Sequence, residues 1–423
     1  MTSFDHALAL RRCWPTSIVI ASGLSAATGA TPSNGVTRHS IWAARLVVFA
    51  AFFDLFVQFP TMAPHARNLG ASAALVGVVV AAYSVTNLFG NLGAGFVLDR
   101  WGRRGPIILG LAITALAVLS YAFVRSPEQL LVARAIHGIG AAALTPGAFS
   151  IIGDWVASDQ RGRAMGLAGA MIAIPAMIGP PVAGFLRDAW GADSVFFLDA
   201  AVLAITLIAF AAVTRGLPYK AARRVARSAK DEAATPIGRL MLSANVTLFA
   251  VTIGVGVLVA HLPLVLESQG ESAARSGFSF AIFALVAILV MASPIGGASD
   301  RLGRFIPVLV GLVGVAAGLA LLGIAESYGA IAVGMAVFGL GYGLIFPAAT
   351  ALVTEAAGAG RRGRAFGIFY AVYSLGVAIG SAGSGRLAGF YEEPLGLPFL
   401  VAAVIVLVAV PIVGVIRRQP VAR

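Results

Sequence analysis

The stretch GFVLDRWGRR, residues 95–104, decides the fold because the chain contains a second copy of it. The copy lies 201 residues later, at residues 296–305, and reads GGASDRLGRF. In both copies Asp-Arg is followed one residue later by Gly-Arg. A spacing that holds across half of the chain indicates two copies of one structural unit. Further pairs at this offset are Gly138, Gly140 and Pro146 with Gly339, Gly341 and Pro347; Arg161 to Ala164 with Arg362 to Ala365; and Gly179 and Gly184 with Gly380 and Gly385.

The composition indicates a membrane protein. Hydrophobic residues make up 59% of the 423 residues, charged residues 11%, and the mean hydropathy is +0.91. A soluble protein of this length cannot bury so much apolar surface, so most of it must face lipid or other helices. The net charge of +12 comes from short arginine clusters between apolar runs, with no aromatic-interleaved basic face. We therefore expect no nucleic-acid partner. The single cysteine, Cys13, excludes an intrachain disulfide and a thiol metal cluster.

Apolar runs of about 20 residues predict twelve membrane-spanning helices. Glycine and proline occur inside several of them, which membrane helices tolerate where neighbouring helices satisfy the backbone. The predicted spans are 41–62, 72–95, 106–124, 129–152, 164–186, 194–214, 240–264, 276–298, 306–325, 330–353, 364–387 and 396–416.

The distribution of positive charge predicts the orientation of these helices. With the N-terminus inside the cell, 23 of the 30 Lys and Arg residues fall on the inner side and two lie within helices. Positive residues accumulate on the cytoplasmic side of membrane proteins, so both termini are expected to be cytoplasmic and the membrane to be the inner (plasma) membrane. The five on the outer side are Arg67, Arg125, Arg187, Arg275 and Arg386.

The repeat and the spans predict five segments. Residues 1–40 form a disordered cytoplasmic extension; a weak signal peptide over 17–30 is the alternative. Six-helix bundles follow at 41–214 and 240–416. Between them, residues 215–239 form a basic cytoplasmic linker suited to lying against anionic lipid headgroups, and 417–423 form a cytoplasmic tail.

The motif at 95–104 lies between the second and third predicted helices and resembles the signature loop of the major facilitator superfamily, with 296–304 as its degenerate second copy. The resemblance covers residues 41 to 416. It implies an all-α membrane protein with twelve transmembrane helices in two pseudo-symmetric six-helix bundles. It also implies a transporter that works by alternating access, most similar to the twelve-helix drug:proton antiporter branch.

Each copy of the loop has an acidic residue at the same distance further along the chain, Asp154 in the first half and Glu355 in the second, which predicts a cytoplasmic gate. Asp99 ends the second helix, where it can accept from the amides at another helix's N-terminus. Arg103 lies within reach of Asp154. At the 201-residue offset, Asp99, Arg103 and Asp154 correspond to Asp300, Arg304 and Glu355. In the family such networks hold the cytoplasmic side shut. That these charges only follow the positive-inside rule is the alternative, which explains the arginines but not the acids. The predicted gate comprises Gly95, Asp99, Arg100, Gly102, Arg103, Asp154, Asp300, Arg304 and Glu355.

Charged residues at membrane depth in the first half predict a proton site. Arg134-Ala-Ile-His137-Gly-Ile-Gly resembles the family's RxxQGxG element, with His137 in place of glutamine. A buried arginine costs about 2.5–3.5 kcal/mol on insertion scales, so it requires a function or a partner. Asp54 is the expected partner, because the helices that carry both residues line the central cavity in the family. We predict that Asp54 carries the proton with Arg134 and His137. A fixed Asp54–Arg134 pair and a packing role for His137 are the alternatives. Asp199 lies in the sixth predicted helix, which is peripheral in the family, so it is not included in the expected site.

The fifth and the cavity-lining helices indicate the substrate path. Gly179, Pro180 and Gly184 lie in an element similar to the GxxxxxxxxGxxxGPxxGG motif of the family's exporters, although Pro175 and Ala183 replace two of its glycines. Small residues let helices approach closely, so this element is expected to shape the seam between the halves. A mostly aromatic cavity suits lipophilic or amphipathic compounds. Its expected lining is Gln58, Asn245, Thr252, Tyr342, Phe346, Tyr370 and Tyr373.

Other classes of protein are less consistent with the sequence. The chain has no GxxxxGK[ST] loop, no GxSxG motif and only scattered histidines, so we expect neither an ATP-driven pump nor an enzyme, and no cofactor or metal. A signalling or structural role without transport is a further alternative, against which the intramembrane Asp54 and Arg134 argue. Proton-coupled efflux by a monomer is the favoured function. Proton-coupled import of a small organic anion, held by Arg134, is the alternative.

Overall fold

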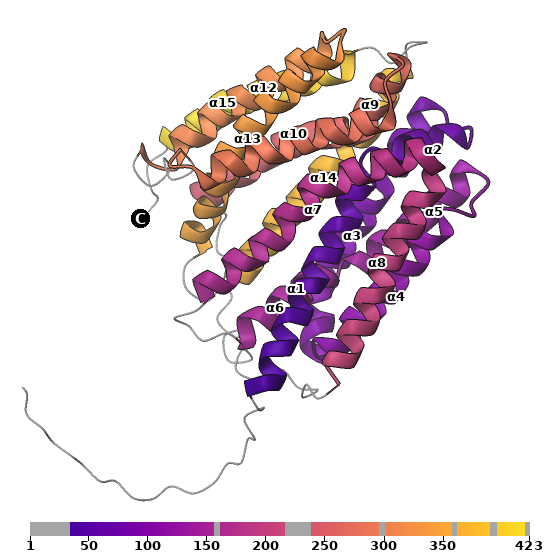
Figure 1. The fold of residues 1–423 in the computed structure, drawn as a ribbon. Coiled ribbons are helices and arrows are strands. Elements are labelled where there is room, and N and C mark those ends of the chain that lie inside the picture. Colours follow the sequence, from indigo (N-terminus) through magenta and orange to yellow (C-terminus); the bar gives the residue numbers. More distant parts are fainter. Residues whose placement is uncertain are drawn as a thin grey trace, which may run out of the picture.

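The computed structural model describes residues 34–155, 161–215, 238–295, 302–357, 362–389 and 396–418. Within these ranges the regular secondary structure is helical. In Figure 1 the helices of the first half and those of the second half form two groups that lie side by side. The first half contains α1 (Asn34–Val57), α2 (Met62–Asn68), α3 (Ala73–Trp101), α4 (Arg104–Ser120), α5 (Pro127–Ala141), α6 (Leu144–Trp155), α7 (Arg161–Trp190) and α8 (Ala192–Val213). The second half contains α9 (Arg239–Ser268), α10 (Ala273–Ala292), α12 (Phe305–Gly323), α13 (Tyr328–Ala357), α14 (Arg362–Ala388) and α15 (Leu397–Arg418).

The described helices account for all twelve predicted spans. Eleven helical segments are long and apolar enough to cross a membrane, and α4 adds a twelfth apolar helix of 17 residues. Two details differ from the sequence-based prediction. The first helix begins at Asn34, inside the segment expected to be disordered. The fourth predicted helix, 129–152, is divided into α5 and α6. The all-α membrane fold predicted from the repeat is confirmed.

The internal repeat is visible in the backbone. The loop motif ends α3 at Gly102, which has φ of 77°, and its second copy has Gly303 at φ of 78°. Glycine adopts this left-handed region without the Cβ clash of other residues, which explains why both copies keep it. Serine caps also correspond: Ser72 Oγ accepts from the amide of Leu75, and Ser272 Oγ from that of Arg275. Matching turns and caps indicate that the duplicated sequence folds twice in the same way.

Two pairs of helices make the most extensive contacts between the halves. Helix α3 packs against α14, and α7 packs against α10. A Cβ placed on Gly385 would lie 2.9 Å from the Cα of Gly77, and one on Gly184 would lie 2.7 Å from the Cα of Ala274. Glycine therefore permits backbone-to-backbone contact at both seams. All four residues lie at the helix ends that the charge distribution assigns to the outer side.

Helix α9 lies at the centre of the second half. In an apolar stretch of 18 residues within α9, 94% of the residues are buried. The helix packs against α13, α14 and α15. Because apolar surface around the helix is covered by protein, α9 is a core helix rather than a lipid-facing one. In the first half, α1 packs in the same way against α6, α7 and α8. This arrangement brings residues of α1 to face those of α5 and α8.

Candidate functional site

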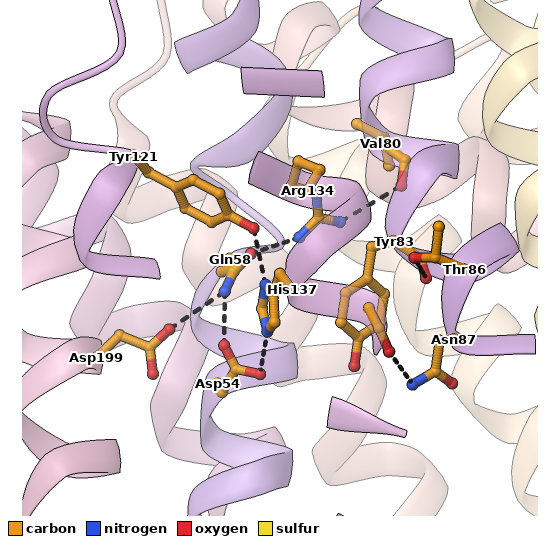
Figure 2. A network of polar contacts seen from close by, with 11 residues as sticks. Asp54, Gln58, Val80, Tyr83, Thr86, Asn87, Tyr121, Arg134, His137 and Asp199 are labelled. Atoms are coloured by element: carbon orange, nitrogen blue, oxygen red, sulfur yellow. Dashed lines mark hydrogen bonds and ion pairs between the residues drawn. The ribbon is translucent and has the colours of Figure 1, made fainter. Parts of the chain in front are cut away.

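A buried polar cluster lies inside the first half, and Gln58 is at its centre (Figure 2). Asp54 lies in the last turn of α1 and Gln58 directly follows the helix, four residues further on, so the two side chains lie close together. The Gln58 Nε2 group donates to Asp54 Oδ1 at 2.7 Å and to Asp199 Oδ2, on α8, at 3.2 Å. Its Oε1 accepts from Arg134 Nη1 at 2.7 Å. One amide side chain therefore connects two carboxyl groups to a guanidinium.

Helix α5 contributes the positive side of the cluster. Arg134 also donates from Nη2 to the carbonyl of Val80 at 3.4 Å, and its Cζ lies 4.9 Å from the centroid of the Tyr83 ring. An arginine over an aromatic face is stabilised by the ring quadrupole. One turn further along α5, His137 Nε2 lies 2.9 Å from Asp54 Oδ2 and Nδ1 lies 2.8 Å from the Tyr121 hydroxyl. Each cationic or imidazole nitrogen named here has a polar partner.

The cluster is sealed from solvent. Asp54 and Asp199 are 0% exposed, His137 is 1% exposed and Arg134 is 7% exposed. Burying charges is costly unless they are paired and hydrogen-bonded, so the network is what allows these groups to exist at this depth. A buried set of ionisable groups in a membrane span can bind or release protons when the protein changes conformation.

The cluster differs from the expected site in three ways. Arg134 does not bond Asp54 directly, because Gln58 lies between them and bonds both. Gln58 was expected to line the substrate cavity, but it is 4% exposed and belongs to the cluster. Asp199 was left out because its helix is peripheral in the family, yet it reaches the same amide. A sequence signal existed: the repeat offset places Leu400 opposite Asp199, so this acid is as asymmetric as Asp54.

The repeat shows that the fold does not require these polar residues. At the equivalent positions of the second half, each member of the cluster is replaced by an apolar residue. These counterparts are mostly buried in the core. A polar cluster that one half has and the other lacks indicates a role in activity rather than in folding. At the 201-residue offset the counterparts of Tyr121, Arg134, His137 and Asp199 are Leu322, Met335, Phe338 and Leu400. Tyr83 corresponds to Phe283, because its edge-on contact with His137 is repeated by that of Phe283 with Phe338. The positions on α9 that correspond to Asp54 and Gln58 fall among Gly254, Val255, Leu258 and Val259.

The second half provides aromatic surface instead. On α13, Phe338, Tyr342 and Phe346 stack in sequence, with ring centroids 6.5 and 5.8 Å apart. Phe283 of α10 packs edge-on against Tyr342 at 5.4 Å. Aromatic pairs at these spacings are stabilising and form rigid apolar walls. Tyr342 and Phe346, expected from the sequence, thus lie together.

The remaining expected cavity residues have different surroundings. Tyr370, on α14, is 46% exposed and contacts Phe366 and Phe369, while Tyr373 is half-buried. Thr252 is fully buried: its hydroxyl donates to the carbonyl of Leu248 on its own helix. It packs against Gly376 of α14, so the structure places it between helices and not on an open face. Asn245 is half-buried, and its Oδ1 has no hydrogen-bond partner among the described residues.

The predicted gate is described in part. In the second half, Arg304 Nε donates to Glu355 Oε1 at 2.8 Å, so the expected arginine–acid contact exists there. The side chains of Asp99 and Asp154, and the whole of Asp300, lie outside the described part of the structure. Of the other gate residues, Gly95 is exposed, the Cζ of Arg100 lies 5.9 Å from the Phe96 ring centroid, Gly102 has the left-handed backbone noted above and Arg103 is half-buried.

The glycine-rich element of α7 lies at the junction between the halves. Gly184 contacts α10 closely, and a Cβ on Gly277 of α10 would lie 3.0 Å from the Cα of Pro181. Gly179 faces α1 instead, where a Cβ would lie 3.4 Å from the amide nitrogen of Val57. Helix α7 continues through Pro175, Pro180 and Pro181. The structure therefore places Pro180 and Gly184 at the seam and Gly179 inside the first half.

Comparison with known proteins identifies the family. The sequence model of the Major Facilitator Superfamily matches residues 46–293 and 246–423. Solved structures of the same fold include a bacterial homolog of the human lysosomal transporter Spinster in an inward-facing and occupied conformation. It superposes with a TM-score of 0.77 at 16% identity and covers 92% of this chain and 98% of its own.

Three curated relatives extend the comparison. An uncharacterized MFS-type transporter of Methanocaldococcus jannaschii is 22% identical, over 84% of this chain and 92% of its own length. The synaptic vesicular amine transporter of Bos taurus is 25% identical, over 82% of this chain and 66% of its own length. Multidrug resistance protein 1 of Bacillus subtilis is 29% identical, over 38% of this chain and 41% of its own. Both copies of the loop motif, the helical fold and the family match agree, and the chain therefore belongs to the Major Facilitator Superfamily and is an integral, multi-pass membrane transporter.

Proposed function

We propose that the protein exports small lipophilic or amphipathic compounds in exchange for protons by alternating access. The observation that carries this proposal is the asymmetry between its halves. A buried ionisable cluster occupies the first half, whereas apolar residues fill the equivalent positions of the second. Ionisable groups at membrane depth mark proton and ion pathways in transporters. The cluster is thus the proton-binding element of the cycle.

The contacts between the halves support an inward-facing conformation. The close approaches at Gly77 and Gly184 lie at helix ends that are on the outer side if both termini are cytoplasmic. At the same ends, Arg187 of α7 forms an ion pair with Glu267 of α9. With the outer ends joined, transport requires that these contacts break while the cytoplasmic ends, which carry the two loop motifs, come together.

The aromatic surface of the second half supports lipophilic substrates. The half-buried Tyr342 and Phe346, which stack in line with the buried Phe338, offer apolar faces with a single hydroxyl, which suits flat or amphipathic compounds better than sugars. The names of two relatives, a multidrug resistance protein and a vesicular amine transporter, are consistent with such substrates. We extend this to the present chain as part of the proposal.

Import of a small organic anion is the alternative, because a buried guanidinium is a natural carboxylate clamp. In this structure, however, Arg134 is engaged within the protein. It donates to Gln58 and to the Val80 carbonyl and lies over Tyr83. An incoming carboxylate would have to displace these contacts inside a cluster that already contains two acids. The efflux proposal is therefore favoured.

Dye accumulation tests the proposal. In bacteria lacking their main exporters, the wild-type protein should lower ethidium accumulation in energised cells, and a protonophore should abolish the effect. Asp54→Asn removes a buried acid of the cluster and should restore accumulation to that of empty-vector cells. Asp193→Asn is the matched control, because Asp193 is exposed near the start of α8. Equal accumulation with wild type and empty vector, together with carboxylate uptake that Arg134→Ala abolishes, would favour the anion importer instead.

A further inference from the structure

Asp199 has a distinct state within the cluster. Asp54 and Asp199 are both fully buried and are connected through the amide of Gln58. The inference drawn from them rests on the proposed proton coupling and concerns which residue holds the proton. Two features of the described residues of the cluster carry it: the number of charged groups, and the number of hydrogen-bond donors that reach each carboxyl oxygen.

The imidazole in the cluster is neutral. His137 Nε2 lies 2.9 Å from Asp54 Oδ2, and Nδ1 lies 2.8 Å from the Tyr121 hydroxyl, which can donate or accept. Burial disfavours a charged imidazolium, and so does the guanidinium of Arg134 in the same cluster. A neutral imidazole with its proton on Nε2 donates to Asp54 and accepts from Tyr121 at Nδ1, so it satisfies both partners. With a neutral imidazole, Arg134 is the one cation in the cluster.

Two ionised carboxylates would leave the cluster with a net negative charge. Tyr83 of α3, Tyr121 directly after α4 and Gln58 directly after α1 line the same space, and none of them supplies a positive charge. An uncompensated charge with no solvent exposure is strongly unfavourable, so one carboxyl group is expected to be neutral. Two close carboxyls commonly hold one proton between them for this reason.

The donors show which carboxyl group is neutral. Both oxygens of Asp54 accept a hydrogen bond, Oδ1 from Gln58 and Oδ2 from His137. Asp199 receives one bond, from Gln58 to Oδ2 at 3.2 Å, and its Oδ1 is buried without a hydrogen-bond partner among the described residues. An ionised oxygen in that position would have no donor, whereas a protonated carboxyl carries its own hydrogen.

We propose that Asp54 and Asp199 form a pair that shares a single transported proton, and that Asp199 holds it in this conformation. Asp54 is then the carboxylate that balances Arg134 through Gln58. The amide of Gln58 donates to both acids, so it keeps them together while it separates Asp54 from the guanidinium. Loss of the proton leaves two anionic carboxylates beside one guanidinium. That imbalance is relieved when the proton is bound again or the cluster rearranges.

Infrared spectroscopy of the purified full-length protein in detergent tests the pair without a transport substrate. A protonated carboxylic acid has a C=O stretching band separate from that of a carboxylate, and the band shifts in D₂O. At about pH 7.5 exposed Asp and Glu are ionised, so they do not contribute. We expect the band in the wild type and in Asp193→Asn, and its loss in Asp199→Asn. A band that persists unchanged in Asp199→Asn overturns the proposal, as does its absence from the wild type.

A second variant keeps the test decisive if Asp199→Asn does not fold. Arg134→Gln removes the cation, so both acids should become neutral and the intensity of the band should rise about twofold; an unchanged intensity contradicts the pair. The outcome is separable from that of the proposed function. If the wild type shows no proton-dependent efflux, the function fails whatever the spectra show. If efflux is proton-dependent but Asp199→Asn retains the band, only the role of Asp199 fails.

Discussion

At the scale of single residues, Gln58 determines the arrangement of the cluster. Among the residues that the structure describes, its amide is the one group that bonds Arg134, Asp54 and Asp199 together. Glutamine suits this place because the carbonyl accepts from the guanidinium while the two amide protons serve the two acids. An acid here would add a third negative charge, and an apolar residue would leave three buried groups without this partner. The geometry of the proton site thus depends on a neutral residue.

Replacing this amide is expected to reduce both stability and coupling. Gln58→Leu keeps the approximate volume but removes every hydrogen bond that the Gln58 side chain makes. Each buried polar group left without a partner costs about 1–3 kcal/mol, so the variant should unfold at a lower temperature in detergent and lose proton-driven efflux. Asn68→Leu is the control, because Asn68 lies exposed at the end of α2. A melting temperature for Gln58→Leu equal to that of the control would show that the bridge contributes nothing.

The sequence reveals some members of the cluster better than others. Asp54, Arg134 and His137 could be identified because a charge or histidine at membrane depth has no polar counterpart at the repeat offset. Asp199 satisfies the same criterion, since Leu400 lies opposite it, but the peripheral position of its helix in the family argued against it. Gln58 could not be assigned, because pattern alone does not say whether an uncharged amide faces a cavity or a buried acid. That distinction depends on side-chain direction, which only the structure supplies.

At the scale of elements, the seam between α7 and α10 depends on glycine. The sequence predicted that the small residues of α7 shape the junction, and the structure places Gly184 against the backbone of Ala274. Gly169 provides the contrast: it lies on the same helix, and a Cβ there would meet no atom within 4 Å. The two positions therefore separate the effect of seam contact from that of adding a methyl group to the helix.

A methyl group at Gly184 should shift the protein away from the present conformation. Gly184→Ala introduces a Cβ that must push α10 away, and such overpacking costs typically about 1–3 kcal/mol. If this cost applies only when the outer ends are joined, the conformational equilibrium moves about 5- to 150-fold toward the opposite state. Spin labels on α7 and α10 near the seam would report the change as a longer distance distribution. The same labels in Gly169→Ala should give the wild-type distribution, and an unchanged distribution in both would contradict the role of the seam.

Polar contacts of Asp188 and Arg187 accompany the glycine seam, and we call them the polar latch. The carboxylate of Asp188 accepts from the backbone amides of Ala273 and Ala274, both at 2.8 Å, at the N-terminus of α10. Free amides and the positive end of the helix dipole make this a favourable place for an anion. Beside it, Arg187 joins Glu267 and donates to the carbonyl of Pro60 at 2.7 Å. The sequence identified Arg187 only as a charge on the outer side. The contacts of Arg187 and Asp188 could not be predicted from it, because their partners lie far away in the chain.

The latch can be tested by removing and restoring its charge. Asp188→Asn keeps the shape but loses the charge at the helix N-terminus, which is worth about 0.3–2 kcal/mol. We expect the population with joined outer ends to fall, and a cysteine at an exposed seam position to react faster with an external thiol reagent. Reversing the neighbouring pair, Arg187→Glu with Glu267→Arg, should restore slow labelling that either single change accelerates. Equal labelling rates in all variants would show that these contacts do not hold the outer side closed.

At the scale of the whole molecule, duplication made most of the fold predictable. The 201-residue offset indicated two equal halves, and the apolar runs located all twelve spans within a few residues. The predicted helix boundaries are wrong where packing against neighbouring residues, and not hydropathy, determines where a helix begins or breaks. Helix α1 begins at Asn34, earlier than its hydropathy suggests, and the span after Pro127 is broken into α5 and α6. Contacts between the halves, such as Gly77 with Gly385, require knowledge of the conformation and cannot be read from a periodic pattern.

The orientation of the molecule is the expectation on which the inward-facing assignment depends. Trp101, at the end of α3, and Leu302, its partner at the repeat offset, are both exposed, and Arg125 is exposed between α4 and α5. With Cys13 replaced by serine, we introduce one cysteine at a time and treat intact cells with a membrane-impermeant maleimide. Trp101→Cys and Leu302→Cys should react only after the membrane is opened, because duplicated loops joined by an even number of spans lie on the same side. Arg125→Cys should react from outside. Labelling of 101 and 302 from opposite sides would refute the parallel repeat, and labelling of both in intact cells would invert the orientation and make this structure outward-facing.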